Sequence, residues 1–120
     1  ALQKAELRAV AAAVLGHIGP DAKTAVPTLL ELLKIEKDPT NRRELLLALC
    51  SIAPETKEAV PLAIAALDDA EERVVLAACL LLSKIGPDAK EALPALKKLS
   101  DSKDEAIRDF AAKAIQAIEK

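Results

Sequence analysis

Very few side chains in this sequence could carry out chemistry. His17 is the single histidine, and Cys50 and Cys79 are the two cysteines among 120 residues. A zinc site needs about four ligands brought together, and the sequence offers no second histidine and no closely spaced cysteine pair. His17 falls at a solvent-type position, and each cysteine has apolar neighbours, where a free thiol behaves as a small hydrophobic residue. The sequence therefore predicts no catalytic residue, no metal and no cofactor.

Charged side chains are numerous but mixed in sign. Lys23, Lys57 and Lys90 recur at nearly equal intervals and could form a ladder for an anionic partner. The acidic residues interspersed with these lysines are Asp21, Glu55, Glu58, Asp88 and Glu91. Such mixing is typical of a solvated surface. The net charge of −2 and the pI near 5.5 also argue against nucleic acid as a partner, because its phosphates require a basic stripe.

The three lysines belong to a longer segment that the chain contains three times. Pro20–Pro27 reads PDAKTAVP, and it returns as PETKEAVP at Pro54–Pro61 and as PDAKEALP at Pro87–Pro94. The interval between the copies is typical of short helical units that stack into a solenoid. Ala and Leu dominate the apolar residues, which favours closely packed helices. The sequence thus predicts an all-α fold with a single domain over residues 1–120.

A second helical pattern lies between the copies of this segment. Its first occurrence is an apolar stripe, with spacings that fit one face of an α-helix, at Leu7, Val10, Ala11, Val14, Leu15 and Ile18. Each repeat therefore has an A helix, which carries the prolines, and a B helix, which carries the stripe. The expected helices span residues 2–18, 21–35, 40–53, 55–68, 70–85, 88–100 and 103–119. The expected units are a lone B helix at 1–19 and repeats at 20–53, 54–86 and 87–120.

Local features at the start of each helix refine this expectation. Pro27, Pro61 and Pro94 fall well inside the A segments, where a proline in the interior of a helix would cost about 3 kcal/mol. We therefore expect one helical turn, a bend, and a restart of the helix near each proline. The acidic residues expected to cap or nearly cap the B helices are Asp38, Asp69 and Asp101.

The pattern resembles HEAT repeats, in particular the bacterial HEAT-like variety with Gly-Pro turns. A HEAT unit has a proline in helix A, an acidic residue in the loop between the helices, and a hydrophobic-Arg pair at the start of helix B. The pairs here are Leu7-Arg8 and Ile107-Arg108, whereas the other two B segments begin with Asn41-Arg42 and Val74-Val75. We therefore expect any Asp–Arg ladder between repeats to be interrupted at residues 70–85.

The resemblance implies a right-handed α-α superhelix of about three and a half repeats, with A helices on its convex side and B helices on its concave side. Arrays of this family mostly bind proteins or peptides and are seldom enzymes. On the two central B segments, apolar residues also lie opposite the stripe. The predicted protein-binding patch on the concave face is Leu46, Leu47, Cys50, Leu76, Cys79 and Leu80, with Asp109 and Lys113 at its rim.

Two interpretations of this patch stay open. Interior helices of a solenoid are buried on several sides, so the patch could be ordinary packing. Alternatively it is a docking surface, because soluble monomers rarely leave a large apolar patch bare. The prediction is a non-enzymatic scaffold whose partner is a protein, a peptide or a second copy of itself.

Cys50 and Cys79 do not form the disulfide framework of a small secreted domain, so we expect a reduced, cytoplasmic location. There is no signal-peptide pattern and no apolar run long enough to span a membrane. We expect no nucleic acid, membrane or small-molecule partner. The competing hypothesis is an engineered or purely structural repeat module without a natural ligand. The absence of Met and the half unit at the start favour a fragment or a design.

Overall fold

A computed structural model of the chain describes residues 26–52 and 57–119. All regular elements in these two ranges are helical, which confirms the predicted fold class. They are α2 (Val26–Ile35), α3 (Pro39–Ile52), α4 (Ala59–Ala66), α5 (Glu72–Ile85), the 3-10 helix η2 (Gly86–Ala92), α6 (Leu93–Leu99) and α7 (Glu105–Glu119). The predicted helix at 2–18 and the first turn of the predicted helix at 21–35 lie outside the described residues.

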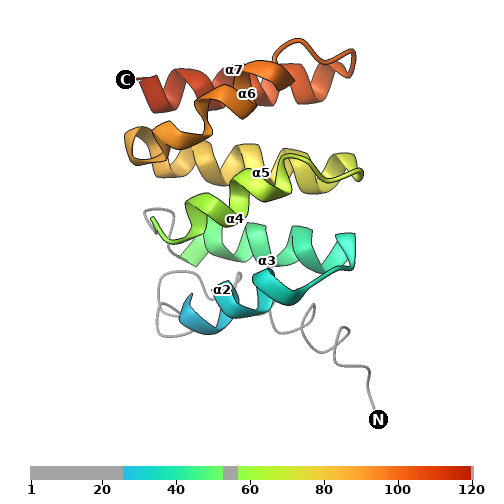
Figure 1. Cartoon of the computed structure of the whole chain (residues 1–120), viewed down its shortest axis with the longest axis vertical. Helices are drawn as coiled ribbons and strands as arrows, with labels where there is room; N and C mark the ends of the chain where they lie inside the picture. The colour runs from blue at the N-terminus through green and yellow to red at the C-terminus, as the bar shows by residue number, and fades with distance from the viewer. Residues whose placement is uncertain (1–25, 53–56, 120) are drawn as a thin grey trace.

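The helices form two layers (Figure 1). The B helices α3, α5 and α7 stack in one layer, where α5 contacts α3 on one side and α7 on the other. The A helices α2, α4 and α6 lie in front of them in Figure 1 and lead into the B helices through short loops at one edge of the stack. Each repeat therefore packs mainly against its neighbours in sequence, as in other solenoids.

The prolines set where the A helices begin. Pro27 is the second residue of α2, Pro61 the third residue of α4, and Pro94 the second residue of α6. A proline is tolerated in this first turn because its missing N–H would have no partner inside the helix. The last repeat shows a complete restart: η2 precedes α6, and Ala89 leaves helical geometry with φ −100° and ψ 26°.

The loops before α3 and α5 contain the expected acidic caps. Asp38 Oδ1 accepts hydrogen bonds from the N–H groups of Thr40 at 2.9 Å and Asn41 at 3.2 Å, so Asp38 caps α3. Asp69 Oδ1 accepts the N–H of Glu71 at 2.8 Å, just before α5 begins. These bonds satisfy backbone donors that the first turn of a helix leaves without a partner.

The prediction for Asp101 is wrong. Asp104 takes the capping role at α7, because its Oδ1 accepts the N–H of Ile107 at 3.1 Å. Ser102 Oγ accepts the N–H of Asp104 at 3.1 Å and so occupies the place that Asp69 has before α5. Asp101 lies too early in the loop to reach the first turn of α7, and it is exposed to solvent.

The core follows the predicted stripe of the B helices. Three columns of period-related residues are buried in every described repeat: Leu45, Ala78 and Ala111; Ala48, Leu81 and Ala114; and Ile52, Ile85 and Ile118. The A helices complete this core with Leu29 and Leu33 of α2, Ala63 of α4, and Leu96 of α6. One continuous hydrophobic core therefore runs between the two layers through all described repeats.

Candidate protein-binding face

Two residues of the predicted patch lie in the packing between repeats. Leu46 of α3 is 0% exposed and Cys79 of α5 is 1% exposed, so both are inside the protein. We name as the inter-repeat face the period-related positions Arg42, Leu46 and Leu49 of α3; Val75, Cys79 and Leu82 of α5; and Arg108, Ala112 and Ile115 of α7. Their spacing of four and three residues places them on one side of each helix. In α3 and α5 the apolar members of this face are buried.

The other four patch residues lie at the protein surface or near it. Leu47, Cys50 and Leu76 are half-buried, and Leu80 is 36% exposed. We call these four residues the open B face. Leu76 and Leu80 lie about 160° around the helix from Ala78, the centre of the buried stripe, whereas Cys79 lies only about 100° from it. That difference explains why the neighbouring repeat covers Cys79 but leaves Leu80 in contact with solvent.

A hollow in the surface adjoins Leu80. It has a volume of about 130 Å³ and is lined by Cys79, Leu80, Ser83, Phe110 and Lys113. It therefore lies where α5 meets α7, with an apolar floor and an ammonium group at its rim. The sequence predicted Lys113 as a rim residue of the patch, whereas Phe110 falls at a position of the apolar stripe and Ser83 at the period-related position of Cys50, a slot for small packed residues. Phe110 is half-buried, and it is the only aromatic residue in the chain.

The two thiols are poor candidates for chemistry. Burial raises the pKa of the Cys50 thiol to about 12, although nearby Lys84 acts in the opposite direction. Burial also raises the pKa of the Cys79 thiol to about 12. The reactive form of a cysteine is the thiolate, so at neutral pH both side chains are protonated. They serve as packing groups at this face, and His17 lies outside the described residues.

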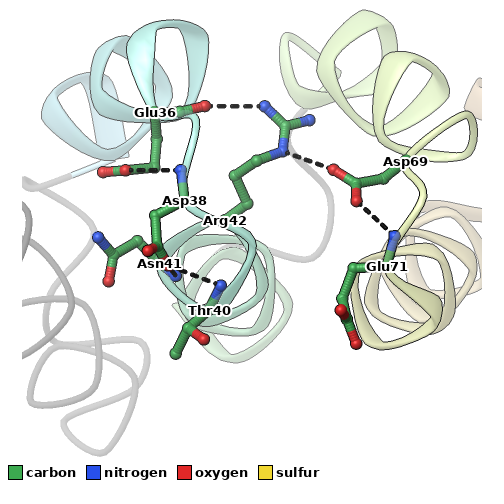
Figure 2. A network of polar contacts seen from close by, with 7 residues as sticks. All are labelled: Glu36, Asp38, Thr40, Asn41, Arg42, Asp69 and Glu71. Carbon is green, nitrogen blue, oxygen red and sulfur yellow. Dashed lines mark hydrogen bonds and ion pairs between the residues drawn. The ribbon is translucent and has the colours of Figure 1, made fainter.

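A polar cluster joins the first two described repeats at the edge where the B helices begin (Figure 2). Arg42 Nη1 donates to the backbone carbonyl of Glu36 at 3.0 Å, within its own repeat. Arg42 Nε lies 3.3 Å from Asp69 Oδ2 of the next repeat. This Nε has no aligned hydrogen-bond acceptor, so the contact with Asp69 is an ion pair. Both side chains are 18% exposed, which shields the pair from much of the screening by water.

The next interface lacks this ion pair, as the sequence predicted. Val75 occupies the position of Arg42 in α5 and is buried. Ser102 occupies the position of Asp69, and its Oγ accepts the N–H of Asp104. The Arg42–Asp69 pair is thus replaced by an apolar contact surface and a neutral hydroxyl.

Carboxylates line the same edge near the starts of α5 and α7. The charge of Asp104 is the main cause that raises the pKa of Glu72, with smaller effects from desolvation and a hydrogen bond to Asp104. A larger hollow of about 370 Å³ lies beside the starts of α3 and α5, and its lining is Asp38, Pro39, Thr40, Arg43, Glu71 and Arg73. Because this lining carries charges of both signs, it does not define a particular ligand.

The A side of the chain shows the mixed, solvated surface that the sequence predicted for its lysines. Lys57 Nζ lies 3.9 Å from Asp88 Oδ1, and both side chains are more than half exposed. Lys90 is also exposed, and Lys23 lies outside the described residues. Exposed pairs of this kind contribute little to stability.

Stacked helix pairs with period-related core columns define a helical-repeat solenoid. The family model of HEAT repeats matches residues 26–119. The chain belongs to the HEAT repeat family, which confirms the resemblance seen in its prolines and loops. The comparison with curated proteins found no match.

Two similar solved structures are designed armadillo repeat proteins. One, in complex with the peptide (KR)4, is 22% identical with a TM-score of 0.68, and the match covers 83% of this chain and 52% of that one. The other is also 22% identical, with a TM-score of 0.74 and coverage of 98% and 60%. This chain thus spans between half and two thirds of their length, and the likeness establishes the fold. In the described part of the chain, no helix has the length and apolar character needed to cross a membrane.

Proposed function

We propose that this chain is a non-enzymatic scaffold that binds a protein or peptide on its open B face, including a second copy of itself. The observation that carries the proposal is the hollow beside Leu80. Here an exposed leucine, the single aromatic side chain and a lysine meet between two B helices. Such a combination of apolar area with a charged rim is common at protein interfaces.

The size of the hollow favours one anchoring side chain over a small-molecule ligand. Small-molecule sites usually have volumes of about 300–1,000 Å³, well above the 130 Å³ found beside Leu80. An apolar side chain of a partner would fill this space and contact Leu80 and Phe110. Leu47 and Leu76 extend the apolar surface toward α3, so a peptide lying across the B helices would meet further apolar contacts.

The fold neighbour that was solved with a peptide supports this proposal, because it is a solenoid of the same general build. The partner chemistry of that protein is not transferred to this chain. The open B face has no charge of its own, and Lys113 is the one basic residue that lines the hollow. We therefore expect a partner with an apolar anchor rather than a strongly basic peptide.

The test compares Leu80→Glu with the matched control Ala65→Glu, which adds the same charge at an exposed position of the A layer. Peptides are first selected from a random display library on the wild-type chain, and their affinities for the two variants are then measured. We expect Leu80→Glu to weaken binding by at least about tenfold, because the apolar contact made by Leu80 is lost. A tenfold change in affinity corresponds to roughly 1.4 kcal/mol of binding free energy. Ala65→Glu should bind as the wild type does.

Light scattering on the same three proteins tests self-association. A wild-type dimer that Leu80→Glu dissociates, with its helical content retained, would identify a second copy as a partner. If all three proteins are monomers and no selected peptide distinguishes Leu80→Glu from Ala65→Glu, the binding function is refuted. A purely structural repeat module would then be the better description.

A further inference from the structure

The hollow beside Leu80 combines two kinds of surface within a small space. Leu80 of α5 and Phe110 of α7 supply apolar area, whereas Ser83 and Lys113 supply a hydroxyl and an ammonium group. All four side chains line the same volume of about 130 Å³, together with Cys79. A ligand that fills the hollow therefore meets apolar atoms, a cation and a hydroxyl group at once.

The two polar groups of the hollow are available to a ligand. Lys113 is exposed, and no ion pair joins its ammonium group to a carboxylate within residues 26–52 or 57–119, including Asp109 one helical turn earlier. Ser83 is half-buried, and its hydroxyl makes no hydrogen bond within the same two ranges. An ammonium group can only donate hydrogen bonds, and a hydroxyl can also donate. This side of the hollow therefore favours a negatively charged acceptor.

The closeness of the apolar and polar groups limits which acidic ligand fits. Within a peptide, an apolar side chain and a carboxylate side chain belong to different residues, and successive side chains of an extended peptide point to opposite sides. The last residue of a chain differs, because its side chain and its α-carboxylate are attached to the same Cα. A hollow with room for one aliphatic side chain and with donors beside it consequently matches a C-terminal residue.

The surroundings of the hollow also indicate the direction of the bound chain. Helix α5 lies between α3 and α7 in the stack (Figure 1). Lys113 lies on α7, whereas the half-buried Leu76 and Leu47 continue the apolar surface from Leu80 toward α3. A chain that ends beside Lys113 would run back across α5 toward α3, so the residues before its last one would meet further apolar contacts.

We propose that the hollow between α5 and α7 recognises the C-terminal residue of a partner protein or peptide. The aliphatic side chain of that residue packs against Leu80 and Phe110, and its α-carboxylate accepts hydrogen bonds from Lys113 and Ser83. This recognition rests on the function proposed for the open B face, since it specifies which part of the partner reaches Leu80. Charge complementarity with Lys113 supports it, and so does the small size of the hollow.

The experiment uses peptides selected on the complete wild-type chain from a random library displayed with free C-termini. The peptide that binds most tightly is synthesised as the free acid, as the C-terminal amide, and with a Gly-Ser extension after its last residue. Calorimetry gives the Kd of each form for the wild type, Lys113→Gln, Ser83→Ala and Lys84→Gln. Lys84→Gln is the matched control, because Lys84 is an exposed lysine near Cys50 that does not line the hollow.

We expect the wild type to bind the free acid at least about fivefold more tightly than the amide, because the amide lacks the charge that strengthens these hydrogen bonds. The extended peptide should bind no better than the amide, since its carboxylate is moved away from Lys113. Lys113→Gln should abolish the preference for the free acid, and Ser83→Ala should reduce it by a smaller factor. Lys84→Gln should retain the preference of the wild type.

Equal binding of the free acid and the amide to the wild type would overturn the proposal, and this comparison requires no variant to fold. A preference for the free acid that survives Lys113→Gln would overturn it as well. In both cases, binding that is weakened by Leu80→Glu but not by Ala65→Glu would leave the function proposed for the open B face intact. If no selected peptide distinguishes Leu80→Glu from Ala65→Glu, that function and the recognition of a C-terminus are both refuted.

Discussion

Helices α5 and α7 carry the same apolar stripe but lie in different surroundings. The stripe residues that face the A layer are buried in both helices, for example Ala78 and its equivalent Ala111. On the inter-repeat face the helices differ, because Leu82 is fully buried while its equivalent Ile115 is half in contact with solvent. The comparison teaches that position in the stack, as well as residue type, decides how much a side chain stabilises the fold.

The largest expected effect comes from shortening the two equivalent side chains. Leu82→Ala should lower the free energy of unfolding by about 2–5 kcal/mol, because it leaves a cavity inside the packed array. Ile115→Ala should cost about 1 kcal/mol, since only part of its apolar area is removed from water. Urea unfolding of the two variants measures the difference. Equal losses would mean that the outer face of α7 is covered in solution.

A smaller effect is expected at the turn that joins α5 to the last A segment. Gly86 has φ +75° and ψ −140°, a conformation that side chains with a Cβ rarely adopt. A Cβ at this position would meet the carbonyl oxygen of Ala117 at 3.8 Å, which is an ordinary contact, so the cost of Gly86→Ala is backbone strain. We expect a loss of about 1–3 kcal/mol.

Thermal unfolding of Gly86→Ala beside Lys84→Ala measures this cost, because Lys84 is an exposed residue on the last turn of the same helix. Lys84→Ala should leave stability within about 0.5 kcal/mol of the wild type. If Gly86→Ala behaves like its control, the turn can adopt another conformation, and the strain argument fails.

The smallest effect separates the two acidic loop residues that the sequence treated as equivalent. Asp38→Ala removes an acceptor for two backbone N–H groups and should cost about 1 kcal/mol. Asp101→Ala should change stability by less than about 0.5 kcal/mol, because its side chain is exposed and caps nothing within the described residues. Chemical denaturation of both variants provides the check. A loss at Asp101 as large as that at Asp38 would contradict the assignment of the cap to Asp104.

Much of the fold could be predicted from the sequence because the signals are repeated. The three proline pairs fix the period, and the stripe fixes which side of each B helix faces the A layer. Pro94 shows the strength of this reasoning, since a proline inside a helix implies a restart, and in the structure the helical geometry is interrupted at Ala89 of η2 before α6 begins. Because the chain contains several copies of the same segment, their residues can be compared position by position, which a single copy would not allow.

The candidate site was harder to predict, because the helical pattern alone does not say which flank the next repeat covers. Cys79 and Leu80 are adjacent and both lie off the stripe, yet one is buried and the other exposed. Loop residues pose a similar difficulty. Asp101 and Asp104 have identical chemistry, and only the path of the backbone decides which carboxylate reaches the first turn of α7.

The prolines also leave the two layers with helices of different length and continuity. The B helices are continuous over 14 or 15 residues, whereas α4 and α6 have 8 and 7 residues, and α6 follows a turn in which the helical geometry is interrupted. We expect the layer of short, interrupted A helices to bend more easily than the layer of continuous B helices. Changes in the curvature of the array should therefore be absorbed among the proline turns, while the spacing between the B helices stays nearly constant. A partner held across those helices would be held at fixed intervals even as the array flexes.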